Sequence, residues 1–108
     1  MANNYKFIGV ALATTTETAL LTAASDETII VRSIRVTNNT ANTPTVSMDL
    51  SDNSASTEYT ILKTQTLSAN TAVEILTVPL VLEASDSSKA TMSSSDSTHI
   101  GISYLVIT

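Results

Sequence analysis

Few side chains in this sequence could take part in chemistry, and the most versatile of them is a single histidine, His99. Catalysis by an imidazole requires a nucleophile or a second base that converges on it, but the residues beside His99 are only hydroxyl-bearing and aliphatic ones. The hydroxyl run Ser93-Ser94-Ser95 lacks the Gly-x-Ser-x-Gly pattern of a nucleophile elbow. We therefore predict that His99 is a polar residue at the entrance of a strand, that no residue is catalytic and that the protein is not an enzyme.

Carboxylates are the next candidates, because three pairs of them could supply oxygen ligands to a hard cation such as calcium. These pairs are Asp26 with Glu27, Asp49 with Asp52, and Asp86 with Asp96. None of them follows the Asp-x-Asp-x-Asp-Gly spacing of a loop that binds calcium by itself. We therefore interpret these acids as solvated turn residues, and we predict neither a metal site nor a cofactor.

Acidic β-proteins also include carbohydrate-binding modules, which hold sugar rings on aromatic side chains. This chain has no tryptophan, and its aromatic residues are Tyr5, Phe7, Tyr59 and Tyr104. A glycan-binding module therefore stays an alternative that the residues do not support.

Charge and hydropathy exclude several classes of partner. The net charge is −5, with only 5 Lys and Arg against 10 Asp and Glu, whereas a phosphate backbone requires clustered cations. No apolar run approaches the roughly 18 residues that span a bilayer, and the N-terminus lacks the pattern of a signal peptide. We expect a protein made in a cytoplasm, with neither nucleic acid nor a membrane as partner. The cations are scattered at Lys6, Arg32, Arg35, Lys63 and Lys89.

The elements that must position these residues are short strands. Ser and Thr alternate with short apolar stretches along the chain, which is typical of half-exposed β-strands. A length of 108 residues indicates one domain, 1–108. We predict an all-β protein, an antiparallel β-sandwich of eight or nine strands that is jelly-roll-like, although an immunoglobulin-like sandwich has similar spacing. The expected strands are 7–13, 17–24, 28–37, 46–50, 58–67, 73–75, 80–84, 90–92 and 100–106.

Two of these segments require a choice. Thr14 and Glu17 have capping-box spacing, but a helix there could run only about two turns, so we favour a strand over 17–24. Within 28–37, Ile29 and Val31 fall on one face of a regular strand, whereas Ile34 and Val36 fall on the other. Strict alternation therefore cannot bury all four on one side. We therefore predict a β-bulge near Arg32-Ser33 that resets the phase.

The N-terminal segment Tyr5-Lys6-Phe7-Ile8 contains half of the aromatic residues. One interpretation makes it part of the first strand. The other makes residues 1–8 an arm that docks on a neighbouring subunit, since chain ends are often free. Tyr5, Phe7 and Ile8 are therefore our candidates for an interface with a neighbouring subunit or with a larger assembly.

Three segments together resemble a known family. Residues 20–38 with the run Thr28-Ile29-Ile30-Val31-Arg32-Ser33-Ile34-Arg35-Val36-Thr37-Asn38, residues 80–90, and the closing residues 99–108 are similar to small β-sandwich virion proteins of tailed bacteriophages, of the capsid decoration or head-tail accessory type. The likeness covers most of the chain. The sequence departs from the family at Ser85, where the family more often has glycine.

The resemblance implies a structural protein of a phage virion, and it carries over no catalytic residue. We expect a capsid decoration or cement protein on the outer surface of the head, because the chain is small and poor in charge and reactive groups. Its partners would be the major capsid protein and further copies of itself, with a trimer favoured. The alternatives are a neck or tail adaptor, a fibre-attachment module, or a glycan-binding module for host attachment.

Overall fold

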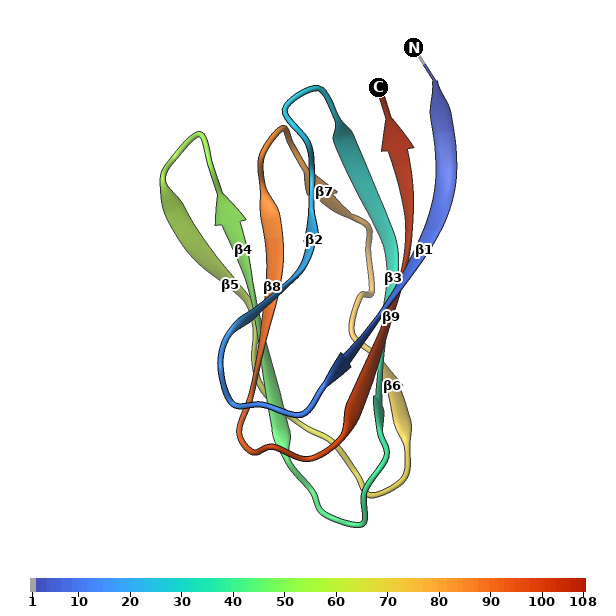
Figure 1. Ribbon diagram of the computed structural model, residues 1–108, viewed down its shortest axis with the longest axis vertical. Helices are drawn as coiled ribbons and strands as arrows, with labels where there is room; N and C mark the ends of the chain where they lie inside the picture. The colour runs from blue at the N-terminus through green and yellow to red at the C-terminus, as the bar shows by residue number, and fades with distance from the viewer. Residues whose placement is uncertain (1) are drawn as a thin grey trace.

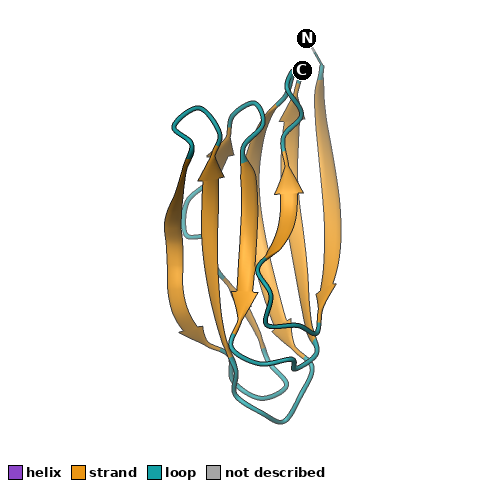
Figure 2. Cartoon of the chain, turned by 60° about the vertical axis from the view of Figure 1, so that its left-hand side comes forward, coloured by secondary structure: helices purple, strands orange, loops and turns teal. Residues whose placement is uncertain are grey.

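The computed structural model describes residues 2–108, and its regular elements are all β-strands (Figure 1). They form two antiparallel sheets packed face to face (Figure 2). We call the sheet with the order β1-β9-β3-β6, in which β7 also pairs with β3, sheet A, and the sheet with the order β2-β8-β4-β5 sheet B. The predicted all-β sandwich is thus confirmed. The strands are β1 (Asn3–Leu12), β2 (Thr18–Thr22), β3 (Thr28–Asn38), β4 (Thr45–Asp52), β5 (Thr57–Thr66), β6 (Ala72–Glu74), β7 (Leu80–Leu82), β8 (Ser87–Met92) and β9 (Thr98–Ile107).

The pairing is nested from the two ends of the chain inward. Strand β1 pairs with β9, β2 with β8, β3 with both β6 and β7, and β4 with β5. If β6 and β7 are counted as one interrupted strand, this is the eight-stranded wrapped hairpin of a jelly roll. The interruption contains Pro79, which cannot donate a ladder hydrogen bond.

The core lies between the sheets and is built by residues that alternate along the strands. In β4, Val46 and Met48 are buried, and in β9, Ile100 and Ile102 are buried, while the residues between them face outward. The alternation predicted for both strands is confirmed. Residues 2–108 contain no helix long and apolar enough to cross a membrane.

The predicted β-bulge is present in β3. Its register against β9 shifts between Val31 and Ser33, and as a result Ile29 and Val31 before the shift and Ile34 and Val36 after it are all buried (0–2% exposed). A strand without the bulge would turn one of these pairs to solvent.

The two undecided segments are both strands. Residues Thr18–Thr22 form β2 and pair with β8, so the strand interpretation of this segment is confirmed. Strand β1 begins at Asn3 and pairs with β9 along its whole length, up to Leu12 opposite Thr98. The possible arm is therefore wrong for residues 3–8, because their backbone is held in sheet A.

One polar residue expected in a loop is buried in the framework. Asn38 is the last residue of β3, and its side chain is 0% exposed. Its amide nitrogen donates to the carbonyl oxygens of Asn42 (2.8 Å) and Ser68 (3.2 Å), and its amide oxygen accepts from the backbone nitrogen (3.0 Å) and hydroxyl (2.8 Å) of Thr40. Asn38 thus ties the loops at this end of the sandwich together.

At the other end of the sandwich, Asp86 is a buried acid that joins two turns by hydrogen bonds, so its interpretation as a solvated acid is wrong. It is 3% exposed, and its carboxylate accepts backbone N–H groups from Asn53 (2.9 Å) and Glu83 (3.0 Å). The preceding Ser85 has a φ of 66°. That is the left-handed conformation that glycine adopts without cost, so a glycine at this position in the resembling family fits the same turn.

Candidate functional site

The outer face of sheet A carries an apolar row that crosses four strands. In register across the sheet, Tyr5 of β1 lies opposite Leu105 of β9, Leu105 opposite Ile30 of β3, and Ile30 opposite Val81 of β7. Tyr5 is 76% exposed and Val81 is 49% exposed. A sheet face that meets only water is normally polar, so this apolar row makes the outer face of sheet A the candidate for a binding surface.

Beside this row the same face is hollowed. Gly9 lies opposite Gly101, and the ring of Phe7 (69% exposed) lies over Gly101, where a methyl group in place of the hydrogen would sit 3.0 Å from the nearest ring carbon. The hollow has a volume of about 610 Å³, and its walls include Arg35 and His99. The two glycines therefore lie at the bottom of the hollow, next to the ring of Phe7, and the side chains of Arg35 and His99 line its walls.

Glu74, a further residue of the hollow, has a structural role in the bulge. Its carboxylate accepts from the hydroxyl of Ser33 and from the backbone nitrogens of Ile34 (2.8 Å) and Leu76 (3.3 Å). Arg35 lies opposite Glu74 in register, but within residues 2–108 its guanidinium takes part in no ion pair. Among the described residues, Arg35 is therefore a cation of this outer face whose side chain is not held in an ion pair.

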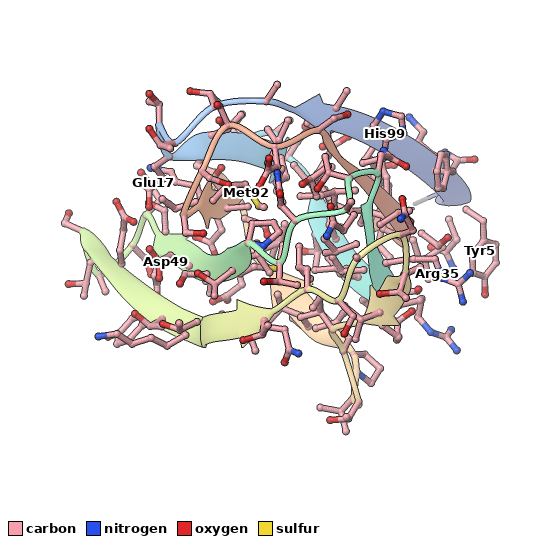
Figure 3. All side chains as sticks on the ribbon, turned by 90° about the horizontal axis from the view of Figure 1, so that it is seen from below. Tyr5, Glu17, Arg35, Asp49, Met92 and His99 are labelled. Carbon is pink, nitrogen blue, oxygen red and sulfur yellow. The ribbon has the colours of Figure 1, made fainter. Side chains whose placement is uncertain are left out.

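Sheet B carries a different cluster on its outer side. Carboxylate oxygens of Glu17, Asp49 and Glu58 all lie within 4.8 Å of one another, and the Lys89 amine lies 4.0 Å from Glu17 and 3.5 Å from Glu58. Partial desolvation, a hydrogen bond with Asp49 and repulsion from Glu58 raise the pKa of Glu17, while Lys89 opposes that shift. Figure 3 shows Glu17 and Asp49 on one side of the molecule and Tyr5, Arg35 and His99 on the other.

Two of the carboxylate pairs considered in the sequence analysis are not brought together, in agreement with their rejection as cation sites. Asp86 and Asp96 lie beyond opposite ends of β8, and Asp49 is grouped with acids of other segments rather than with Asp52. Asp52 accepts from the Ser54 hydroxyl (2.9 Å) in its own turn. The close approach of three acids to Lys89 depends on strand pairing and could not be read from local spacing.

Asp96 is held by its own loop. Hydrogen bonds from the Ser94 hydroxyl (2.7 Å) and the Asn42 amide (2.9 Å) lower the pKa of Asp96. In the turn before β3, Glu27 accepts the backbone N–H of Ala24 (2.9 Å). Both acids therefore stabilise turns, as hydrogen-bonded rather than free carboxylates.

His99 is exposed on β9, opposite Ala11 and Thr37. No side-chain hydrogen bond to its imidazole is present within residues 2–108. Its position is therefore that of a surface residue at the rim of the hollow.

The three predicted interface residues divide between the two sides of β1. Tyr5 and Phe7 face outward, whereas Ile8 is half-buried and packs against the core. Sequence reasoning missed Ile30, Leu105 and Val81. A signal was available, because three or more consecutive apolar residues, such as Tyr104-Leu105-Val106-Ile107, must place apolar groups on both faces of a strand.

Comparison with known proteins shows the fold of this chain but not its family. No family of known proteins matches the sequence, and neither does any curated protein. The class that the fold defines is a jelly-roll β-sandwich, and three similar solved structures illustrate how different the proteins with this fold are. A subunit of the disulfide-linked pili that form Bacillus endospore appendages has a TM-score of 0.56 at 8% identity, over 97% of this chain and 84% of that one.

The core of Drosophila NLP, described for its pentamer formation and histone binding, has a TM-score of 0.54 at 16% identity, over 91% of this chain and 96% of that one. A protein of infectious bursal disease virus strain Gx has a TM-score of 0.55 at 12% identity and covers 98% of this chain. This chain spans 33% of that viral protein. At these identities the likeness shows the fold alone.

Proposed function

We propose that this protein is a non-enzymatic structural component of a tailed bacteriophage virion, a decoration protein bound in many copies to the outer surface of the head. The observation that carries the proposal is the apolar row on the outer face of sheet A, from Tyr5 through Leu105 and Ile30 to Val81. A surface of this kind gains stability only when a partner covers it.

The fold supports the proposal in a general way. Pilus subunits, a core described for pentamer formation and histone binding, and a virus protein share it, so this sandwich is one that several assemblies use as a building part. The resemblance of residues 20–38, 80–90 and 99–108 to phage virion proteins supplies the more specific setting.

The partners we propose are the major capsid protein and further copies of this chain, in a trimer. Repetition over a capsid allows each contact to be weak, because linked contacts strengthen one another through effective concentration. Tyr5 and Phe7, exposed on the edge strand of sheet A, would be central to one of these contacts.

Counting copies in purified virions tests this proposal. Quantitative mass spectrometry against the major capsid protein should give hundreds of copies per particle, and a particle reconstruction should place the sandwich on the head. About six or twelve copies would instead indicate the neck or tail axis, which is the adaptor alternative. Absence from purified particles would contradict a virion role altogether.

The hollow beside Gly9 and Gly101 favours a second candidate function, glycan binding. Its volume of about 610 Å³ is within the range of small-ligand sites, and Phe7 offers an exposed ring against which a sugar could stack. A glycan array probed with the wild-type protein and with Phe7→Ala tests this candidate. Specific binding that Phe7→Ala abolishes would support host attachment, and an array without signal would exclude it for the glycans it carries.

A further inference from the structure

The two sheets carry opposite charge. Among the strands of sheet A the charged residues are Lys6, Arg32, Arg35 and Glu74, and the carboxylate of Glu74 is already engaged by the bulge. In sheet B and the residue before β2, four carboxylates face two amines. The charged residues of this group are Glu17, Asp49, Asp52, Glu58, Lys63 and Lys89.

We propose that the outer face of sheet A binds the outer face of sheet B of a second copy, so that the chains associate head to tail. The inference rests on the self-association included in the proposed function and names its two surfaces. The apolar row through Tyr5 and Leu105 would lie at the centre of the contact. Arg32 and Arg35 would face the carboxylate cluster of Glu17, Asp49 and Glu58.

Electrostatics favours this arrangement over a two-fold contact. If sheet A met sheet A, Arg32 and Arg35 of one copy would approach the same residues of the other. If sheet B met sheet B, two carboxylate clusters that already raise the pKa of Glu17 would be brought together. Like charges that are brought together in an interface oppose association, and opposite ones favour it and set its register.

The dimensions of the molecule are sufficient for such a contact. Its principal extents are 45, 27 and 21 Å, so a broad side of the sandwich is on the order of the ~800 Å² that each partner buries in a standard interface. An apolar centre surrounded by charged residues is also the usual anatomy of a specific interface.

A head-to-tail contact uses two different surfaces of each chain, so every copy has one of each to offer. Such contacts form a closed ring if the rotation between copies divides a full turn, and an open column if it does not.

Charge reversal on each face separately provides the test. Arg35→Glu alters sheet A, and Glu58→Lys alters sheet B, while Glu83→Lys makes the same charge change in the exposed turn after β7 and serves as control. Association of the purified full chains is measured by sedimentation velocity over a range of concentrations and salt. Circular dichroism confirms that each variant is folded, and Arg32→Glu replaces Arg35→Glu if the latter is not.

Each single variant should weaken self-association by about tenfold or more, and the control should not change it. An equimolar mixture of Arg35→Glu and Glu58→Lys should restore association, because each variant retains the surface that the other has lost, and the two reversed faces complement each other. Wild-type association should weaken as salt is added.

Three results would overturn the inference. Association unaffected by Glu58→Lys would exclude sheet B from the contact, a mixture that stays as weak as its components would exclude complementary faces, and a wild-type monomer at high micromolar concentration would exclude self-association. None of these results bears on whether the protein is found in virions. The virion measurement can likewise fail while the head-to-tail contact stands.

Discussion

The two outer faces of this sandwich are built from strands of the same geometry, but they carry different kinds of side chain. The inner faces of both sheets are apolar and meet in one core. On the outer face of sheet B, Lys89 is paired with Glu17 and Glu58, and hydroxyl-bearing residues such as Ser47 and Thr91 alternate with the core residues. On the outer face of sheet A, Tyr5 and Phe7 are exposed and Arg35 has no ion pair among the described residues.

The comparison shows that alternation explains the core of the protein but not its surface. Sheet B pairs Lys89 within the monomer and offers a partner mainly its excess of negative charge. Sheet A leaves apolar area and positive charge uncovered, so we place the apolar centre of the proposed contact on sheet A and its acidic counterpart on sheet B. The following variants test, in turn, the stability of the fold that both faces share and the contribution of each face to self-association or stability.

The largest effect is expected from Asn38→Ala, which removes the buried amide that ties the loops together at one end of the sandwich. The substitution leaves the carbonyl oxygens of Asn42 and Ser68 without the amide that binds them, and unsatisfied buried groups of this kind cost about 1–3 kcal/mol each. We expect the free energy of unfolding in urea to fall by about 3 kcal/mol. The neighbouring, exposed Asn39→Ala is the control, and an equal loss in both variants would contradict the role given to Asn38.

Tyr5→Ser should distinguish the faces most directly. Tyr5 is 76% exposed and Tyr59, in sheet B, is 51% exposed, so the same substitution at the two sites removes a similar side chain. We expect Tyr5→Ser to weaken self-association by about tenfold, as for an aromatic anchor in an interface, and Tyr59→Ser to leave it within about twofold. Sedimentation velocity measures both, and a greater loss from Tyr59→Ser would contradict the position of the apolar row of sheet A at the centre of the contact.

A smaller effect is expected at the two paired glycines of the hollow. An alanine methyl at Gly9 would meet Phe7 at an ordinary 3.6 Å, but at Gly101 it would lie 3.0 Å from the same ring. Gly9→Ala should therefore stabilise the fold by about 0.4–1 kcal/mol, because it reduces the entropy of the unfolded chain. Gly101→Ala should stabilise the fold less, because its methyl group must displace the ring of Phe7. NMR should show a shift of the Phe7 proton resonances in Gly101→Ala that is absent in Gly9→Ala.

The smallest effect concerns the acid cluster of sheet B. Because the pKa of Glu17 is raised in the folded state, its charged form costs stability above that pKa, and the cost disappears as the pH falls below the ordinary value of 4.5. Glu17→Gln should therefore raise stability at pH 7 by on the order of 0.5 kcal/mol, the scale of exposed charge interactions. Thermal unfolding at pH 7 and pH 4 checks this, with the exposed Glu83→Gln as control. A gain that is larger at pH 4 would contradict the assignment.

The sequence predicted much of the fold and little of the surface chemistry. Local periodicity was sufficient for the strands, for the bulge between Val31 and Ser33, and for the choice of strand over helix in Thr18–Thr22. It failed for Asp86, because a turn acid looks the same in sequence whether it faces solvent or folds back onto two backbone N–H groups. It failed also for Ile8, whose side of β1 depends on the register that β9 imposes.

By itself, the sequence determined an all-β sandwich with an alternating core, because the inward and outward positions of a strand follow from a period of two residues. Only the tertiary structure decided which strands are neighbours. That decision aligned Tyr5, Leu105, Ile30 and Val81 from four separate segments into one row, and gathered Glu17, Asp49, Glu58 and Lys89 on the opposite side. The physical reason is that hydrogen bonding between strands fixes contacts between residues far apart in the chain, which no local pattern records.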